Sequence, residues 1–112
     1  MRITILFSVL LLAVTATAAD GVSHRYVIER EIPGASELSA DELREISRKS
    51  RDVLASLGPE IKWMHSYVAG DKFYCVYEAP NPDLIRKHAE LGGFPADRIE
   101  EVSAVIDPST AE

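Results

Sequence analysis

Four side chains in the second half of the chain are of types that bind transition metals: His65, Cys75, Glu78 and His88. Imidazole, thiolate and carboxylate together form the mixed nitrogen, sulfur and oxygen sets that suit nickel, copper or zinc. The sequence contains neither a CxxC nor an HExxH motif, so the fold would have to bring such a set together. We therefore expect a divalent transition-metal site, with nickel, copper and zinc as the candidate ions.

The first three of these residues lie in one predicted β-hairpin. Two runs rich in aromatic and β-branched residues, 62–68 and 72–77, flank a turn at residues 69–71 whose glycine can adopt a positive φ. The same stretch contains the only tryptophan and the only cysteine of the chain. This concentration of unusual side chains is typical of a functional site.

The length of the hairpin turn decides which candidate ligands share a face of the sheet. A three-residue loop over residues 69–71 would set His65 directly opposite Cys75. A two-residue loop at residues 70–71 would separate them and put His65 on the same face as Glu78. The residue types leave both registers open.

A strand and a helix are predicted before the hairpin. Residues 24–32 carry apolar side chains on both faces of a predicted strand. Ser39 and Glu42 form a capping box, after which apolar residues recur at helical spacing until Gly58 ends the helix. This amphipathic helix needs a sheet or another helix to cover its apolar side.

A second helix and a final strand are predicted after the hairpin. Asn81 and the proline after it favour a helix over residues 82–91, whose inward stripe includes His88 and Leu91. Residues 98–106 alternate in polarity and are predicted to form the last strand. His88 would thus face the protein and reach toward the sheet.

The order of elements is β-α-β-β-α-β, which predicts an α+β ferredoxin-like sandwich. Right-handed crossovers arrange its four antiparallel strands as 4-1-3-2, with both helices on one face. Because the strands are apolar on both sides, the open face needs a cover. A second copy packed sheet against sheet would supply it, so we expect a homodimer of the dimeric α/β-barrel type.

Residues 1–19 are predicted to be a secretory signal peptide. Their apolar run, residues 3–14, is shorter than the ~20 residues that a membrane-spanning helix needs, and small residues allow cleavage after Ala18 or Ala19. The expected product is one domain over residues 20–112, periplasmic or secreted, with no stable membrane association once the leader is removed. In an oxidising compartment its single cysteine would be buried, metal-bound or paired with another chain.

The composition narrows the class of protein. With 112 residues, 46% hydrophobic and 27% charged, the chain has room for one globular domain, and its net charge of -6 argues against nucleic acid as a partner. Two alternatives to metal binding stay open: a small cofactor-free dimeric-barrel enzyme of the oxygenase or isomerase type, and an interaction module without a small-molecule site. In either case the histidines would be ordinary hydrogen-bonded residues and Cys75 a buried hydrophobic one.

Most of the predicted domain resembles a family of small ferredoxin-like proteins of unknown function that includes a nickel-binding protein. The resemblance extends over about residues 26–112 and is carried by VIEREIPGA (27–35), LSADELREIS (38–47), HSYVAGDKFYCVYEAP (65–80) and IRKHAELGGFPADRI (85–99). It implies a dimer of ferredoxin-like sandwiches and nickel binding in at least one member. The resemblance does not assign the family's metal ligands to individual residues of this chain, so the four candidate ligands are chosen from the chemistry of their side chains. The predicted signal peptide also departs from the bare domain that is usual in the family.

Overall fold

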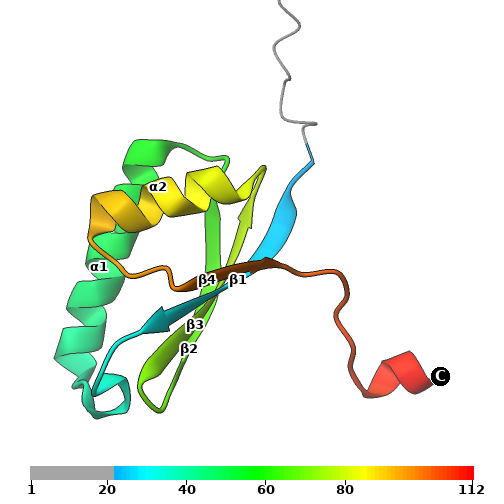
Figure 1. Cartoon of the computed structure of the whole chain (residues 1–112), viewed down its shortest axis with the longest axis horizontal. Coiled ribbons are helices and arrows are strands. Elements are labelled where there is room, and N and C mark those ends of the chain that lie inside the picture. Colours follow the sequence, from blue (N-terminus) through cyan, green and yellow to red (C-terminus); the bar gives the residue numbers. More distant parts are fainter. Residues whose placement is uncertain (1–21) are drawn as a thin grey trace, which may run out of the picture.

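A four-stranded antiparallel sheet with two helices on one face makes up the body of the chain (Figure 1). The computed structural model describes residues 22–112, so the predicted signal peptide at residues 1–19 lies outside the described residues. The elements are β1 (His24–Glu31), α1 (Ala40–Leu57), β2 (Lys62–Ala69), β3 (Lys72–Ala79), α2 (Pro82–Gly92) and β4 (Arg98–Glu101), with short 3-10 helices at Ala35–Glu37 and Pro108–Ala111.

The sheet order is β2-β3-β1-β4, which is the predicted 4-1-3-2 order taken from the other edge. The ferredoxin-like prediction is therefore confirmed. Neither helix of the described part, residues 22–112, is long and apolar enough to cross a bilayer.

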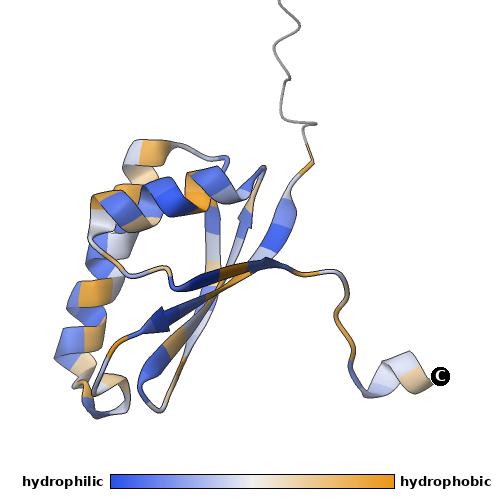
Figure 2. Ribbon diagram, in the orientation of Figure 1, coloured by the Kyte–Doolittle hydropathy of each residue, from blue (hydrophilic) through white to orange (hydrophobic). Residues whose placement is uncertain are grey.

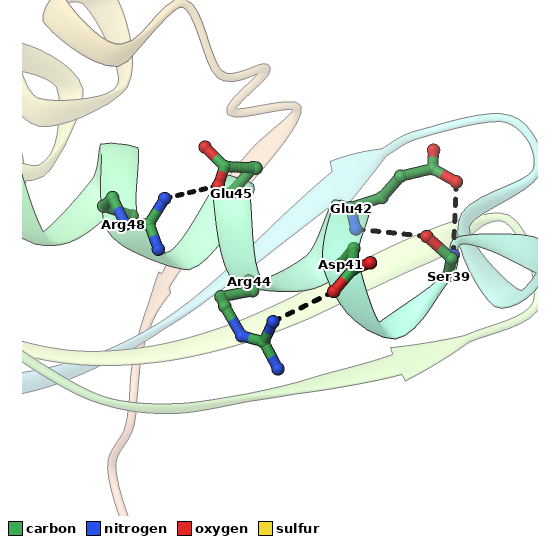
Figure 3. Close-up of polar contacts among 6 residues, drawn as sticks. All are labelled: Ser39, Asp41, Glu42, Arg44, Glu45 and Arg48. Carbon is green, nitrogen blue, oxygen red and sulfur yellow. Dashed lines mark hydrogen bonds and ion pairs between the residues drawn. The ribbon is translucent and has the colours of Figure 1, made fainter.

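Helix α1 begins with the predicted capping box. The Ser39 hydroxyl accepts a hydrogen bond from the Glu42 amide at 3.1 Å, and the Glu42 carboxylate accepts one from the Ser39 amide at 3.3 Å (Figure 3). Along the outer side of the helix, Asp41 and Arg44 form an ion pair at 2.9 Å. These local contacts hold the first turn, while the other side of α1 packs on the sheet.

Helix α2 differs from the prediction in its last turn. Leu91 was expected to face the protein, but it is 51% exposed, and Gly92 is buried instead. A Cβ atom at Gly92 would lie 2.4 Å from the Phe94 ring, so the absence of a side chain lets this ring pack against the helix end. Gly92, and not Leu91, is therefore the residue of the last turn that packs inward.

Alternate residues of β1 and β3 point to opposite faces of the sheet. On the side covered by the helices, Tyr26, Ile28, Phe73, Cys75 and Tyr77 are buried and form most of the core. Their neighbours along each strand point to the open face, where no element of the described chain covers them and most are half-buried.

The hairpin has the shorter of the two predicted loops. Ala69 pairs with Lys72, so the turn consists of Gly70, with φ +59°, and Asp71. A bulge at Met64 adds one residue to β2.

The bulge determines the direction of the side chains on either side of Met64. Trp63 pairs with Tyr77 on the helix-covered face, whereas His65 pairs with Val76 on the open face. On a regular strand without a bulge, Trp63 and His65 would share a face, because side chains two positions apart point the same way.

Strand β4 is shorter than the predicted segment, residues 98–106. Glu101 lies opposite Tyr26, and the last bond to β1 runs from the Val102 amide to the Arg25 carbonyl at 2.8 Å. Because β1 begins at His24, the chain beyond this point has almost no strand left to pair with.

Residues 102–112, which we call the C-terminal arm, extend away from the body (Figures 1 and 2). Two hydrophobic residues in the arm are strongly exposed: Val105 is 69% and Ile106 is 78% accessible. The arm thus carries apolar surface that no described part of its own chain buries.

Candidate functional site

Buried polar side chains gather between the helices and the sheet. Arg30 of β1 is 2% exposed, Ser50 of α1 is 5% exposed and His88 of α2 is fully buried. With the hydroxyl of Tyr77 from β3, they form what we call the inner polar cluster. Each comes from a different element, so only the folded chain brings them together.

Hydrogen bonds connect the inner polar cluster but leave two of its atoms unpaired. The Ser50 hydroxyl lies 3.2 Å from Nε2 of His88 and 3.4 Å from the Tyr77 hydroxyl. Arg30 donates from Nη1 to the carbonyl of Pro95. Nη2 of Arg30 and Nδ1 of His88 are buried and have no hydrogen-bond partner among residues 22–112.

Arg30 carries the only charge of the inner polar cluster at neutral pH. Burial, and then the positive charge of Arg30, lower the pKa of His88 to about 4, so its ring is neutral. Burial also raises the pKa of Tyr77, which keeps its hydroxyl protonated. No carboxylate of the described chain pairs with Arg30, although a buried charge is costly unless it is compensated.

A cavity of about 180 Å³ opens beside the cluster, between α1 and the sheet. Its lining is mainly apolar, and Arg30 is its only charged residue. Trp63 also lines the cavity, and its indole donates to the Ser66 hydroxyl at 2.9 Å. The guanidinium carbon of Arg30 lies over the Phe94 ring, 5.5 Å from the ring centroid. The same ring stacks against the His88 ring, with 5.7 Å between the two centroids.

Two of the predicted metal ligands belong to this helix-covered layer. Cys75 is 3% exposed, free of any disulfide and part of the cavity lining. His88 lies in the same layer but is bonded through Nε2 to Ser50. The other two predicted ligands lie across the sheet.

His65 and Glu78 are on the open face, as the two-residue turn requires. His65 pairs with Val76, two positions from Glu78 along β3, so the two side chains are diagonal neighbours. His65 is exposed and its ring packs edge-on against Tyr67 at 5.0 Å. The Glu78 carboxylate accepts from Arg25 at 2.8 Å.

The chain does not bring its four predicted ligands together. The sheet separates His65 and Glu78 from Cys75 and His88, because the turn directs His65 to the open face while α2 covers the other. Within residues 22–112, no group of three or more histidine, cysteine, aspartate or glutamate side chains could hold a metal ion. The prediction that the two imidazoles share one pocket is therefore wrong, and residues 22–112 of one chain do not by themselves supply three ligands to a nickel ion.

The prediction missed the two residues that organise the cavity, Arg30 and Ser50. Arg30 has the same strand parity as the buried Ile28, which was a usable sign that it points inward. Ser50 lies four residues after Ile46 and four before Leu54, in the middle of the apolar stripe of α1. A polar residue on a buried stripe is a more informative signal than its residue type alone.

Fold and topology define this chain as a small ferredoxin-like α+β protein. Residues 26–102 match the family model described as "Nickel responsive protein SCO4226-like", and the chain belongs to that family. The predicted resemblance is thereby confirmed. A search of the curated proteins found no match.

A solved structure of SCO4226 from Streptomyces coelicolor A3(2) is similar in fold. Its TM-score is 0.61 at 20% sequence identity, and the similarity covers 73% of the present chain and 99% of the other. At that identity the likeness establishes the common fold and not a shared site.

Proposed function

We propose that the protein is an exported homodimer that binds a divalent transition-metal ion, nickel in the first instance, on the open face of its sheet. The observation that carries the proposal is the diagonal placement of His65 and Glu78 on that face. An imidazole and a carboxylate are both suitable nickel ligands, and the family description names nickel. This function requires neither Cys75 nor His88.

Two donors are half of a metal site, so a second copy is part of the proposal. A twofold axis through the open face would bring the partner's equivalent pair to the same ion, because a symmetric interface uses one surface patch twice. The site would then have two imidazoles and two carboxylates. The absence of a group of three or more ligands within residues 22–112 of one chain is in keeping with such a shared site.

The open face and the C-terminal arm support the dimer. Val27, Tyr74 and Val76 are half-buried there, and no helix or strand within residues 22–112 covers them. In the arm, Val105 and Ile106 are exposed where β4 has run out of strand to pair with. A second copy packed on this face would bury both apolar surfaces together.

The ion pair between Arg25 and Glu78 uses one carboxylate oxygen and would compete with metal binding for the charge of Glu78. Its side chains are 42% and 26% exposed, so water screens the pair and its loss is inexpensive. Metal affinity should also fall as pH falls through the imidazole range, because a protonated histidine cannot bind a metal ion.

Calorimetric titration of tag-free protein with NiCl₂ tests the site. We expect one ion per two chains, and at least tenfold weaker binding in His65→Ala and in Glu78→Gln. His24→Ala is the matched control, because His24 pairs with Glu101 at 2.7 Å on a different part of the sheet. Unchanged heat and stoichiometry in the first two variants would contradict the proposal.

Sedimentation of the full chain and of a chain ending at Val102 tests the dimer. The full chain should sediment as a dimer at micromolar concentration, and loss of residues 103–112 should shift it toward monomer because the exposed apolar part of the arm is removed. A monomeric full chain would overturn the shared site.

Export is tested separately, by fractionating cells that produce the full chain. The proposal predicts protein outside the cytoplasm, with an amino terminus at Ala19 or Asp20 by mass spectrometry. Intact chain that still begins at Met1 and stays in the cytoplasm would rule the export step out.

A further inference from the structure

We propose that the cavity beside Arg30 binds a small monocarboxylate with an apolar body, held by the Arg30 guanidinium on the helix-covered side of the sheet. This site is separate from the nickel proposal, because it uses the opposite face and shares no residue with it. Arg30 is 2% exposed, lines the cavity and has a buried Nη2 without a hydrogen-bond partner among the described residues.

The unpaired guanidinium indicates that the ligand is an anion. A buried charge without a counterion is strongly disfavoured, and among the described residues Arg30 contacts the Pro95 carbonyl, the Phe94 ring and the Tyr77 hydroxyl, none of which is charged. His88 is neutral and adds no second positive charge, so one negative charge suffices. A carboxylate oxygen at Nη2 would supply both the missing acceptor and the counterion.

The rest of the lining indicates an apolar body with few polar groups. Leu43, Ile46, Val68 and Phe73 contribute hydrocarbon surface, whereas the uncharged polar contribution comes chiefly from hydroxyl groups. A phosphate dianion would keep one negative charge uncompensated, because Arg30 is the one charged residue among the described residues of the lining. At about 180 Å³ the cavity suits a compact aromatic or branched aliphatic acid.

The surface outside the cavity favours the approach of an anion. A neighbouring hollow shares Ser47 and Trp63 with the cavity and is otherwise lined by three arginines, Arg44, Arg48 and Arg51. Arg44 and Arg48 are paired with carboxylates on α1, but Arg51 has no ion pair within the described residues. In a chain of net charge -6, this local positive patch would concentrate anions at the entrance.

Trp63 provides a direct readout, because it is the only tryptophan and it lines the cavity. We would titrate the full-length protein with benzoate, and with benzyl alcohol as a neutral ligand of similar shape, and follow the Trp63 fluorescence. Benzoate should produce a saturable change and raise the melting temperature, whereas benzyl alcohol should bind at least tenfold more weakly.

Three variants separate the site from general effects on folding. Arg30→Met should weaken benzoate binding about 10- to 100-fold, the loss expected for one charge-assisted hydrogen bond. Arg25→Met is the matched control, an arginine of the same strand on the open face, and should bind benzoate like the wild type. Ser47→Phe keeps Arg30 but places a ring at the cavity entrance, so it should also abolish the fluorescence change.

Several outcomes would overturn the proposal. They are equal binding of benzoate and benzyl alcohol, competition by phosphate as strong as by benzoate, and benzoate binding in Ser47→Phe that matches the wild type. If Arg30→Met fails to fold, the Ser47→Phe result and the comparison with the neutral ligand still decide. A failure here would leave the nickel titration unaffected, since His65 and Glu78 lie across the sheet.

Discussion

The two faces of the sheet differ in how their charged side chains are buried and paired. On the covered face, Arg30 is buried beside a neutral histidine, and no carboxylate in the described part of the chain pairs with it. On the open face, Arg25 of the same strand pairs with Glu78, and Lys72 lies 4.0 Å from Glu29. Water screens the open charges, so they need no special partner, whereas a covered charge depends on what the fold or a ligand provides.

The largest contrast should appear when neighbouring residues of β1 are truncated. Ile28 is fully buried under the helices, while the adjacent Val27 is half-buried on the open face. We expect Ile28→Ala to cost about 4 kcal/mol of unfolding free energy through a new cavity, and Val27→Ala about 1 kcal/mol or less. Urea unfolding of the two variants measures both.

Repeating these measurements over a range of protein concentration sharpens the comparison. If a second copy covers the open face, the cost of Val27→Ala should grow with concentration while that of Ile28→Ala stays constant. Equal costs for the two variants at low concentration would show that the faces do not differ in burial.

The next effect is acid sensitivity that originates on the covered face. The pKa of His88 is about 4 in the fold and near 6.5 in an unfolded chain, so the unfolded state binds more protons between these values. The contribution of neutral His88 to the free energy of unfolding is complete above pH 6.5. It is lost as pH falls toward 4, by about 3 kcal/mol in total.

Urea unfolding between pH 7.5 and pH 4 measures the loss. His88→Gln keeps a hydrogen-bonding side chain beside Ser50 but cannot accept a proton in this range, so it should lose less stability in acid than the wild type. His65→Gln is the control on the open face and should retain the wild-type loss. Identical pH profiles for wild type and His88→Gln would remove His88 as the source.

The smallest effect should come from an ion pair on the open face. Breaking the pair between Arg25 and Glu78 with Arg25→Ala should change stability by less than about 1 kcal/mol, because both side chains are partly exposed. A double-mutant cycle with Glu78→Ala, run at a protein concentration low enough to favour the monomer, isolates their coupling, which added salt should weaken. Coupling of several kcal/mol at that concentration would mean that the pair is buried within a single chain.

Local signals were sufficient for most of the fold. The capping box at Ser39, the proline after Asn81 and the glycine of the hairpin turn act within a few residues, and each element that they predict is present. Of the two errors, one depended on a distant contact, since β4 stops where β1 offers it no further partner. The other lay in the last turn of α2, where Gly92 packs inward against Phe94 and Leu91 is exposed.

The candidate site was less predictable than the fold. The choice between hairpin registers placed Glu78, and not Cys75, on the face of His65, and residue types alone could not make that choice. The importance of Arg30 was also hidden, because it stands between two glutamates in a segment that resembles a charged edge. Only its parity in the strand indicated that it points inward.

By itself the sequence determined the family, the order of strands and helices and their caps, since hydrophobic period and capping act over short distances. Only the tertiary structure decided which side chains share a face. The two-residue turn sent His65 to the face away from His88, the bulge put Trp63 on the opposite face from His65, and the segment after α2 packed Pro95 and Phe94 against the buried Arg30. The physical reason is that side-chain direction in a strand reverses with every residue, so one inserted residue changes what a site contains.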